Sequence, residues 1–232
     1  MGTRAVALQA AGRGGCRLRP GPGRRRGRTR ARLLAAAFPV FAVNGYGRVS
    51  IAEICAGAGF SRGAFYSNFE SVDELFLALY EERAAELRHR VATLLPRVRT
   101  AVSGPHDRSP LVEQLSRVML SEPDRLLFET DVRAYAARRP AAARVHRAAR
   151  RELAETVLDT LTAPCDVPLS PGRREEAVRS VLEAYDAVTA QLVLDGDADR
   201  ARERLARLLL GAVSSAESAP GRPAGPPAAQ GG

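Results

Sequence analysis

The sequence contains no tryptophan, only three cysteines and no long apolar run. Cys16, Cys55 and Cys165 are far apart and form no Cys-x-x-Cys pair, so they predict neither a disulfide framework nor a metal site and favour a reducing compartment. No uninterrupted apolar stretch approaches the ~18–20 residues that a membrane-spanning helix needs. We therefore expect a cytoplasmic protein, and neither a disulfide-bonded secreted protein nor an integral membrane protein.

Lysine is absent as well, because all 35 basic side chains are arginines. They stand against 26 acidic side chains in 232 residues, which gives a formal net charge of +9. Ten of the arginines lie in residues 1–32, a segment that has no acidic side chain, so residues 33–232 hold 25 arginines against 26 acids. The net charge therefore describes the N-terminal segment, and the remainder of the chain is close to neutral.

Both ends of the chain have compositions that oppose folding. Residues 12–28 are rich in Gly, Pro and Arg, and residues 215–232 are rich in Pro, Gly and Ala, so neither segment can bury enough apolar surface. We expect residues 1–26 to be either a disordered basic arm or a stretch upstream of the true translation start. Residues 215–232 are expected to be a disordered tail.

The segment between these ends has the periodicity of helices. Apolar residues recur at i, i+3 and i+4, as in the stripe from Leu33 to Phe41, and no run shows the alternation of a half-buried strand. Ser-Ile-Ala-Glu at 50–53 and Ser-Val-Asp-Glu at 71–74 are capping boxes. The dipeptides Ser109-Pro110 and Ser170-Pro171 each place a cap before a proline at the first helical position. These signals predict helices at about 29–44, 51–57, 61–67, 73–95, 110–120, 123–138, 141–163, 172–194 and 198–213.

Residues 51–67 form two short helices joined by a tight turn that contains glycine, which indicates a helix-turn-helix. The exposed face of its second helix carries short, polar or flat side chains. Such side chains let the backbone approach DNA closely, and base edges in the major groove are read by residues near a helix N-terminus. The candidate DNA-binding residues of this face are Ser61, Arg62, Gly63, Ala64, Tyr66, Ser67 and Asn68.

Two of these residues have alternative roles. Arg62 could bond a guanine bidentately or clamp a phosphate, and the sequence leaves both open. Tyr66 and Asn68 could reach phosphates, and for Tyr66 a phosphate contact is favoured over a core position because Phe65 and Phe69 already fill the inward positions.

Two serines of the motif combine structural and functional roles, and one cysteine has a structural role. Ser50 and Ser61 cap helices in either case, and the helix starts that they cap present free N–H groups to phosphates. Ser50 therefore joins the candidate DNA-binding residues. Cys55 lies on the inward side of its helix, where it is favoured as a core residue over a redox sensor.

The residues from 36 to 75 follow a specific order: Ala36-Ala37-Phe38, Phe41, Asn44-Gly45-Tyr46, Ser50-Ile51-Ala52-Glu53-Ile54, Ala58-Gly59-Phe60-Ser61-Arg62-Gly63-Ala64-Phe65-Tyr66, Phe69 and Glu74-Leu75. This order closely resembles that of the TetR/AcrR family of bacterial transcriptional regulators, over about residues 28–80. The resemblance implies an all-α homodimer with an N-terminal three-helix DNA-binding head that contains the helix-turn-helix. It also implies a larger helical domain that binds a small-molecule inducer and mediates dimerisation.

On this resemblance we expect the DNA-binding domain at 27–87 and the ligand-binding and dimerisation domain at 88–214. The last two long helices are expected to pack as a four-helix dimer bundle. Val72 stands where the family usually has a lysine, and Glu70 adds a negative charge nearby. Both departures lower the affinity for DNA that the resemblance implies.

The C-terminal half carries fewer signals. Met119, Phe128, Tyr135 and Tyr185 recur on helical faces, where they are either ordinary core residues or the lining of an inducer pocket. A stripe of apolar residues between 178 and 212 is either core or dimer seam.

Charged residues of this half are also ambiguous, because Glu129, Asp131 and Arg133 either orient a polar ligand or are solvated. The three histidines show no metal-ligand spacing. There is no P-loop, Gly-x-Ser-x-Gly or His-Glu-x-x-His motif, so the sequence predicts no enzyme, no metal and no cofactor.

We therefore interpret the chain as a DNA-binding transcriptional regulator, a repressor that a small-molecule inducer releases from a palindromic double-stranded operator. The predicted helix at 73–95 joins the head to the ligand domain, and its tilt would change the separation of the two recognition helices. One alternative is a helical dimer that binds protein partners, with a DNA head weakened by Val72 and Glu70. The other is a basic arm that binds nucleic acid without sequence preference.

Overall fold

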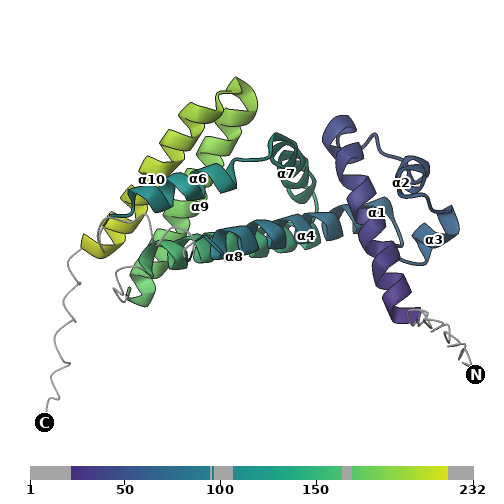
Figure 1. Cartoon of the computed structure of the whole chain (residues 1–232), viewed down its shortest axis with the longest axis horizontal. Coiled ribbons are helices and arrows are strands. Elements are labelled where there is room, and N and C mark those ends of the chain that lie inside the picture. Colours follow the sequence, from purple (N-terminus) through teal and green to yellow (C-terminus); the bar gives the residue numbers. More distant parts are fainter. Residues whose placement is uncertain (1–21, 95, 97–106, 164–168, 219–232) are drawn as a thin grey trace, which may run out of the picture.

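The computed structural model of the chain describes residues 22–94, 96, 107–163 and 169–218, and the regular structure within them is helical. α1, α2 and α3 gather at one end of an elongated molecule, and α6, α9 and α10 lie at the other (Figure 1). The long helices α4 and α8 run side by side between the two ends. The bounds of the helices are α1 Pro22–Asn44, α2 Ile51–Ala58, α3 Arg62–Tyr66, α4 Val72–Ala92, α6 Ser109–Met119, α7 Pro123–Ala136, α8 Pro140–Thr162, α9 Pro171–Asp195 and α10 Ala198–Ser218.

Proline marks the start of several helices. α7, α8 and α9 each begin at a proline, which is favourable because the first N–H groups of a helix have no acceptor within it. Ser170 occupies the cap position of α9, but its side chain makes no capping hydrogen bond. Ser109 is the first residue of α6, and Arg108 precedes it as the cap. The expected cap at Ser170 before Pro171 is therefore confirmed in position, although it lacks a side-chain bond. The expected cap at Ser109 is wrong by one residue, because Arg108 takes the cap position.

The two expected capping boxes differ in outcome. At 50–53, the Ser50 hydroxyl accepts from the Glu53 N–H, and the Glu53 carboxylate accepts from the Ser50 N–H, so the box is complete. At the start of α4, the Ser71 hydroxyl accepts from the Glu74 N–H at 3.1 Å. The Glu74 carboxylate accepts instead from the N–H of Glu70 at 2.6 Å, so only half of this box forms.

The helices at both ends extend further than the composition predicts. α1 begins at Pro22, so residues 22–26 are helical and not part of an irregular arm. Arginine is a good helix former, and proline is favoured at the first helical position. α10 continues to Ser218 because Ala216 is buried and Glu217 forms an ion pair with Arg108 at the start of α6. Most of the expected arm and tail lies outside the described residues.

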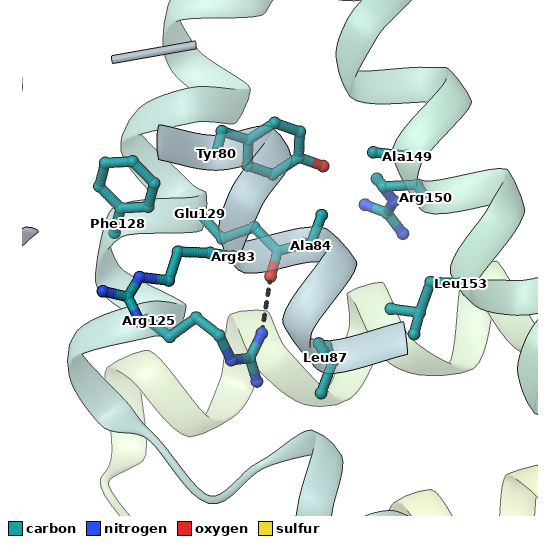
Figure 2. A pocket seen from close by; sticks show the side chains of 10 residues that line it. All are labelled: Tyr80, Arg83, Ala84, Leu87, Arg125, Phe128, Glu129, Ala149, Arg150 and Leu153. Carbon is teal, nitrogen blue, oxygen red and sulfur yellow. Dashed lines mark hydrogen bonds and ion pairs between the residues drawn. The ribbon is translucent and has the colours of Figure 1, made fainter. Parts of the chain in front are cut away.

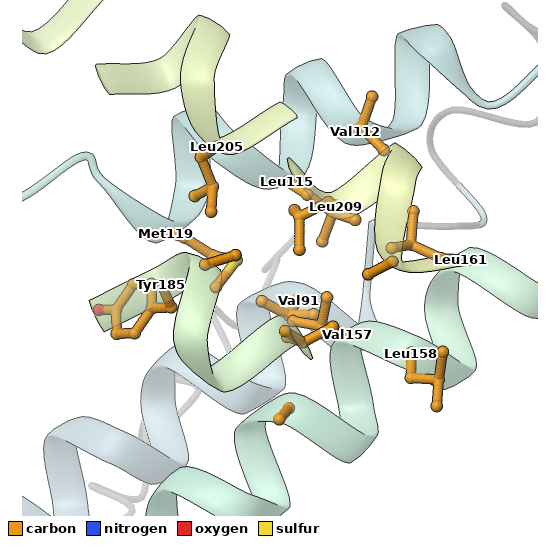
Figure 3. Packing of buried hydrophobic residues seen from close by; sticks show 14 of the residues in the cluster. Val91, Val112, Leu115, Met119, Val157, Leu158, Leu161, Tyr185, Leu205 and Leu209 are labelled. Carbon is orange, nitrogen blue, oxygen red and sulfur yellow. The ribbon is translucent and has the colours of Figure 1, made fainter. Parts of the chain in front are cut away.

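The larger apolar core joins α6, α8, α9 and α10 to the C-terminal part of α4. Figure 3 shows side chains from these helices converging, among them Val91, Leu115, Val157 and Leu209. Each of these four is at most 1 % exposed, and burying such a side chain contributes about 1.5–3 kcal/mol. Among the described residues, none of the helices is apolar over a length that could cross a membrane.

The second apolar core belongs to the head, yet α7 and the start of α8 contribute to it. The ring centroids of Phe41 and Phe76 lie 5.0 Å apart, and Phe128 of α7 lies 5.0 Å from Phe76 and 6.0 Å from Phe41. Such tilted and edge-on pairs are the favoured arrangements of aromatic rings. The packing therefore does not follow the domain boundary expected between residues 87 and 88, because α7 shares the core of the head.

Candidate functional site

The helix-turn-helix is shaped by the turn between α2 and α3. Gly59 ends α2 in the left-handed conformation, with φ of 68°, and its N–H bonds to the carbonyls at the end of the helix. Ile54, Cys55 and Ala58 of α2 pack with Phe65 of α3 in the core of the head. Burial raises the pKa of the Cys55 thiol. The turn thus holds α3 against α2 by one face and leaves the other face outward.

Serine hydroxyls hold the starts of both helices. Ser50 and Glu53 form the complete box described above, and the Ser50 hydroxyl and N–H lower the pKa of the Glu53 carboxyl. At the start of α3, the Ser61 hydroxyl accepts from the Ala64 N–H at 3.3 Å. Both serines are exposed, so they carry a capping role and face solvent at the same time.

Three of the expected residues are exposed on the outward face of α3. Arg62, Gly63 and Tyr66 are exposed, with 58 % of Tyr66 accessible, while Ala64 is half-buried. Phe65 points inward and is fully buried. This arrangement presents one long cation, one aromatic hydroxyl and an open stretch of backbone on a single face, which is the combination that a groove of DNA accommodates.

The last two expected residues of this face are engaged with their own helix. The Ser67 hydroxyl donates to the Gly63 carbonyl at 2.8 Å, and the Asn68 amide donates to the Ala64 carbonyl at 2.8 Å. Asn68 is half-buried, and its side-chain oxygen has no hydrogen-bond partner among the described residues. A contact with DNA through either side chain has to replace or share these bonds.

Two arginines of α1 pack against the helix-turn-helix. The sequence analysis did not predict this role for them. Arg30 stacks over the ring of Phe69 at 4.3 Å, and Arg32 stacks over the ring of Phe60 at 4.7 Å. Arg32 also donates to the Ala58 carbonyl at 2.9 Å. In the sequence, the two arginines lie just before the apolar stripe of α1, but this position does not show which rings they stack on. That role depends on where the fold places the two phenylalanines.

The four residues expected to line an inducer pocket do not come together. Met119 and Tyr185 lie in the larger core, whereas Phe128 and Tyr135 lie in the core of the head. The cavity between α4, α7 and α8 is lined by only one of them, Phe128. The four side chains divide in this way because residues on separate helices can share a helical period without sharing a neighbour.

Figure 2 shows this cavity, which has a volume of about 20 Å³. α4 contributes one wall, α7 the second and α8 the third. It is lined by Tyr80, Arg83, Ala84, Leu87, Arg125, Phe128, Glu129, Ala149, Arg150 and Leu153.

A buried polar cluster adjoins the cavity. Arg125 donates to the Tyr185 hydroxyl at 2.9 Å, and its guanidinium lies 3.4 Å from the Glu129 carboxylate. Tyr185 in turn donates to Glu129 at 3.1 Å. Burial, followed by the charge of Glu129, raises the pKa of the Tyr185 phenol, so it stays protonated and acts as a donor. The cluster links α7 to α9 behind the cavity wall.

The charged residues left ambiguous by the sequence all have partners. Glu129 pairs with Arg125, and Arg133 forms an ion pair with Asp186 at 2.6 Å. Asp131 accepts a hydrogen bond from the backbone of the head. None of the three is simply solvated, because each connects α7 to another residue of the fold.

The loop between α1 and α2 is tied to α7 and α4. The Tyr46 N–H donates to Asp131 of α7 at 2.9 Å. The Tyr46 hydroxyl donates to one oxygen of Asp73 at 2.6 Å, and the Tyr135 hydroxyl donates to the other at 2.8 Å. Gly45 has φ of 74°, which turns the chain into this position. The loop thus enters α2 from a position held by hydrogen bonds to two other helices.

Comparison with known proteins agrees with this geometry. A family model described as bacterial regulatory proteins, tetR family, matches residues 33–79. A protein of Mesorhizobium loti classed as a TetR-family transcriptional regulator has 18 % sequence identity and a TM-score of 0.66, over 82 % of this chain and 96 % of that one. A transcriptional regulator from Rhodococcus has 19 % identity and a TM-score of 0.64, over 82 % and 99 %.

A third solved structure has higher identity. The multidrug binding protein EbrR, solved with imidazole, has 27 % identity and a TM-score of 0.53, over 77 % of this chain and 93 % of that one. The matched residues 33–79 cover α2 and α3, the C-terminal half of α1 and the start of α4. The similarity to the first two structures, below 25 % identity, concerns the fold alone.

Proposed function

The helix-turn-helix domain places this chain in the TetR family of bacterial regulatory proteins, and on that premise we propose that it is a repressor whose operator binding is relieved by a small molecule. DNA-binding transcriptional regulation follows from the family. The direction of regulation and the relief by a ligand are the proposal, and they rest on how α7 connects the cavity to the head.

For DNA, we propose that Arg62 and Tyr66 make the principal side-chain contacts, since both are exposed on the outward face of α3. Ser50, Ser61, Gly63 and Ala64 are proposed to contribute through backbone approach and phosphate contacts. Ser67 and Asn68 complete the proposed set, and they contribute less because their side chains bond to the carbonyls of α3.

The observation that carries the regulatory proposal is that one helix, α7, contacts both the cavity and the head. α7 lines the cavity with Arg125 and Glu129, and one turn further on it holds the head through Asp131 and Tyr135. A ligand that displaces α7 therefore displaces the loop that leads into α2. This mechanism differs from a tilt of α4 alone, because Tyr135 of α7 donates a hydrogen bond to Asp73 of α4. The same carboxylate accepts from the Tyr46 hydroxyl of the loop, so both helices are connected to the loop.

Such a displacement matters only in a dimer, in which two recognition helices must meet half-sites about one helical turn apart. We propose that the dimer forms through the outer face of α9 and α10, where Ala187, Leu208 and Gly211 line a shallow groove. Leu208 is 39 % exposed there. Leu208→Glu should yield monomers in sedimentation equilibrium, whereas a dimer that persists unchanged excludes this face.

The proposal is tested by binding the full chain to the region upstream of its own gene, in the presence of excess random DNA. Retention of a discrete fragment, and its release by a metabolite extract, support a regulator relieved by a ligand. Binding that random DNA abolishes would instead favour the basic arm as a non-specific nucleic-acid binder. No binding at all would favour a module for protein partners, for which Val72 and Glu70 weaken the head.

A further inference from the structure

The N-terminal half of α1 carries a dense group of cations. Six arginines precede the apolar stripe of this helix, at positions 24, 25, 26, 28, 30 and 32, and residues 1–32 contain no acidic side chain. Like charges four residues apart on a helix repel one another, so these arginines do not stabilise α1 by themselves. The family model begins at residue 33. The matched domain therefore does not account for these cations.

Two of these arginines show where this half of α1 lies. The Arg30 guanidinium stacks over the ring of Phe69 at 4.3 Å and donates to the Asn68 carbonyl at 3.4 Å, just after the end of α3. Arg32 donates to the Ala58 carbonyl at 2.9 Å, at the end of α2 and just before the turn into α3. One side of α1 therefore lies along α3, with contacts before it and after it.

Arg26 and Arg28 continue the same side of α1 beyond the packed part of the head. Arg26 precedes Arg30 by four residues and Arg28 precedes Arg32 by four, so each pair lies on one side of the helix, about 5–6 Å apart. Both are exposed, and the described residues contain no carboxylate that forms an ion pair with either. A Cβ added at Gly27, between them, would meet no atom within 4 Å.

This exposed start of α1 lies at the same end of the molecule as α3 (Figure 1). The two guanidinium groups therefore extend the surface beside α3, and they are available to an anionic partner that α3 itself approaches.

The charge of the rest of the head makes these cations important for binding DNA. Residues 33–79 hold two arginines, Arg48 and Arg62, against four acidic side chains, a net charge of −2. With the six arginines of residues 22–32 included, the net charge becomes +4. Cations that neutralise phosphates supply most of the affinity of non-specific DNA binding and much of that of specific binding. The matched domain alone is poor in this respect, and α1 supplies the missing charge.

We propose that Arg26 and Arg28 bind the phosphate backbone of the operator duplex, beside the major groove that α3 enters. This inference rests on the proposed function, because it extends the DNA surface of the same head. A guanidinium matches the geometry of phosphate oxygens, and double-stranded DNA carries one negative charge about every 1.7 Å along its axis. Two exposed cations on the side of α1 that follows α3 therefore meet phosphates when α3 meets base edges.

The test measures the affinity of the full chain for DNA as a function of salt concentration. The probes are the fragment retained from the region upstream of its gene and a random duplex of equal length. Each phosphate contact contributes about −0.9 to the slope of log affinity against log salt concentration. The double variant Arg26→Gln/Arg28→Gln should therefore reduce the size of this slope by about two for each bound subunit. An unchanged slope overturns the proposal.

The same double variant should weaken binding to the retained fragment and to random DNA by the same factor, because phosphates carry no sequence information. Glutamine is about as good a helix former as arginine, and both positions are exposed, so the free energy of unfolding in urea should not change. A loss of affinity for the retained fragment alone would assign the two arginines to base edges and overturn the phosphate contact.

The variant Arg26→Lys/Arg28→Lys tests the kind of contact. An ammonium also binds a phosphate as a point charge, so lysine should restore the slope of the parent to within about one. If lysine lost as much as glutamine, the site would require the guanidinium itself, as in the minor groove, and the assignment to phosphates would be wrong.

Arg117→Gln/Arg179→Gln is the matched control for charge. It removes two exposed arginines from α6 and α9, which lie at the other end of the molecule. The salt slope should equal that of the parent. An equal fall with this variant would show that the effect follows the net charge of the chain and not the position of Arg26 and Arg28.

The same titrations separate this inference from the proposed function. If the parent prefers the retained fragment over random DNA and Arg26→Gln/Arg28→Gln leaves the slope unchanged, only this inference fails. If the parent prefers no fragment, yet the slope on random DNA falls in the double variant, the phosphate surface is supported and the sequence-specific regulator is excluded. No binding to either DNA overturns both.

Discussion

The backbone N–H of Tyr46 donates a 2.9 Å hydrogen bond to the carboxylate of Asp131, 85 residues further along the chain. Asp131 lies on α7, two residues after Glu129 of the cavity wall. The bond therefore joins the loop that enters the helix-turn-helix to a helix that lines the cavity. It is the most direct polar connection between the two regions among the described residues.

We predict that Asp131→Ala uncouples the two sites. The variant should fold, bind operator and still bind the small molecule that releases the parent, because Asp131 is not in the cavity wall. The change of operator affinity on adding ligand should fall several-fold, since coupling between sites typically amounts to about 1–3 kcal/mol. Fluorescence anisotropy with labelled operator, with and without ligand, measures this change. A response equal to that of the parent would show that the coupling follows another route.

Asp73→Asn should change the acid sensitivity of the fold. The Tyr46 hydroxyl, with help from the Tyr135 hydroxyl, holds the pKa of Asp73 below its ordinary value, against the opposing effect of burial. Because the pKa of Asp73 is lowered in the folded state, its contribution to stability is complete above the unfolded pKa of ~3.9 and is lost as the pH falls through the lower folded pKa. The variant should lose about 1 kcal/mol at pH 7 and show a shallower decline below pH 4.

Urea unfolding of Asp73→Asn between pH 7 and pH 3 measures this difference. Glu81→Gln, which alters an exposed carboxylate on the same helix, is the control. If the two variants had the same pH profile, the hydrogen bonds to Asp73 would make no measurable contribution to the free energy of unfolding.

Two glycines at the end of α2 should respond in opposite ways to substitution by alanine. Gly59 has φ of 68° at the end of α2, so Gly59→Ala should cost about 1–2 kcal/mol of unfolding free energy. An added Cβ there would meet only Arg32 at 3.6 Å, so the cost comes from the backbone and not from a clash.

Gly57→Ala, two residues earlier and within α2, should stabilise by up to about 1 kcal/mol, because alanine is the better helix former. Its added Cβ would lie 3.6 Å from Ala36, an ordinary contact. Urea denaturation of both variants tests the pair, and stabilisation by Gly59→Ala would contradict the left-handed turn.

Substitutions on α3 should separate the two roles open to Arg62. If Arg62 reads a base, Arg62→Ala relaxes specificity at one operator position by about 1–3 kcal/mol; if it clamps a phosphate, binding weakens evenly and the salt slope falls by about one. Tyr66→Ala should weaken binding to all sequences. Arg117→Ala, an exposed arginine of α6, is the control. Unchanged operator affinity in both α3 variants would refute this assignment of the DNA contacts.

Local sequence patterns were sufficient to predict most helices and the helix-turn-helix. The stripe of α1, the capping box at 50–53 and the glycine that ends α2 involve contacts between residues a few positions apart. Such contacts depend on helical periodicity and capping chemistry, which a single sequence displays directly. For the same reason, the exposure of Arg62 and Tyr66 followed from the inward positions of Phe65 and Phe69.

By itself, then, the sequence determined the helical class, the DNA-binding motif and the face that the motif presents. Only the tertiary structure decided that α7 packs into the head, that Met119 and Tyr185 lie apart from Phe128, and that Arg125 meets a hydroxyl 60 residues away. The physical reason is that packing between helices depends on which faces meet in space, and helical periodicity shows that a face is apolar without showing what covers it.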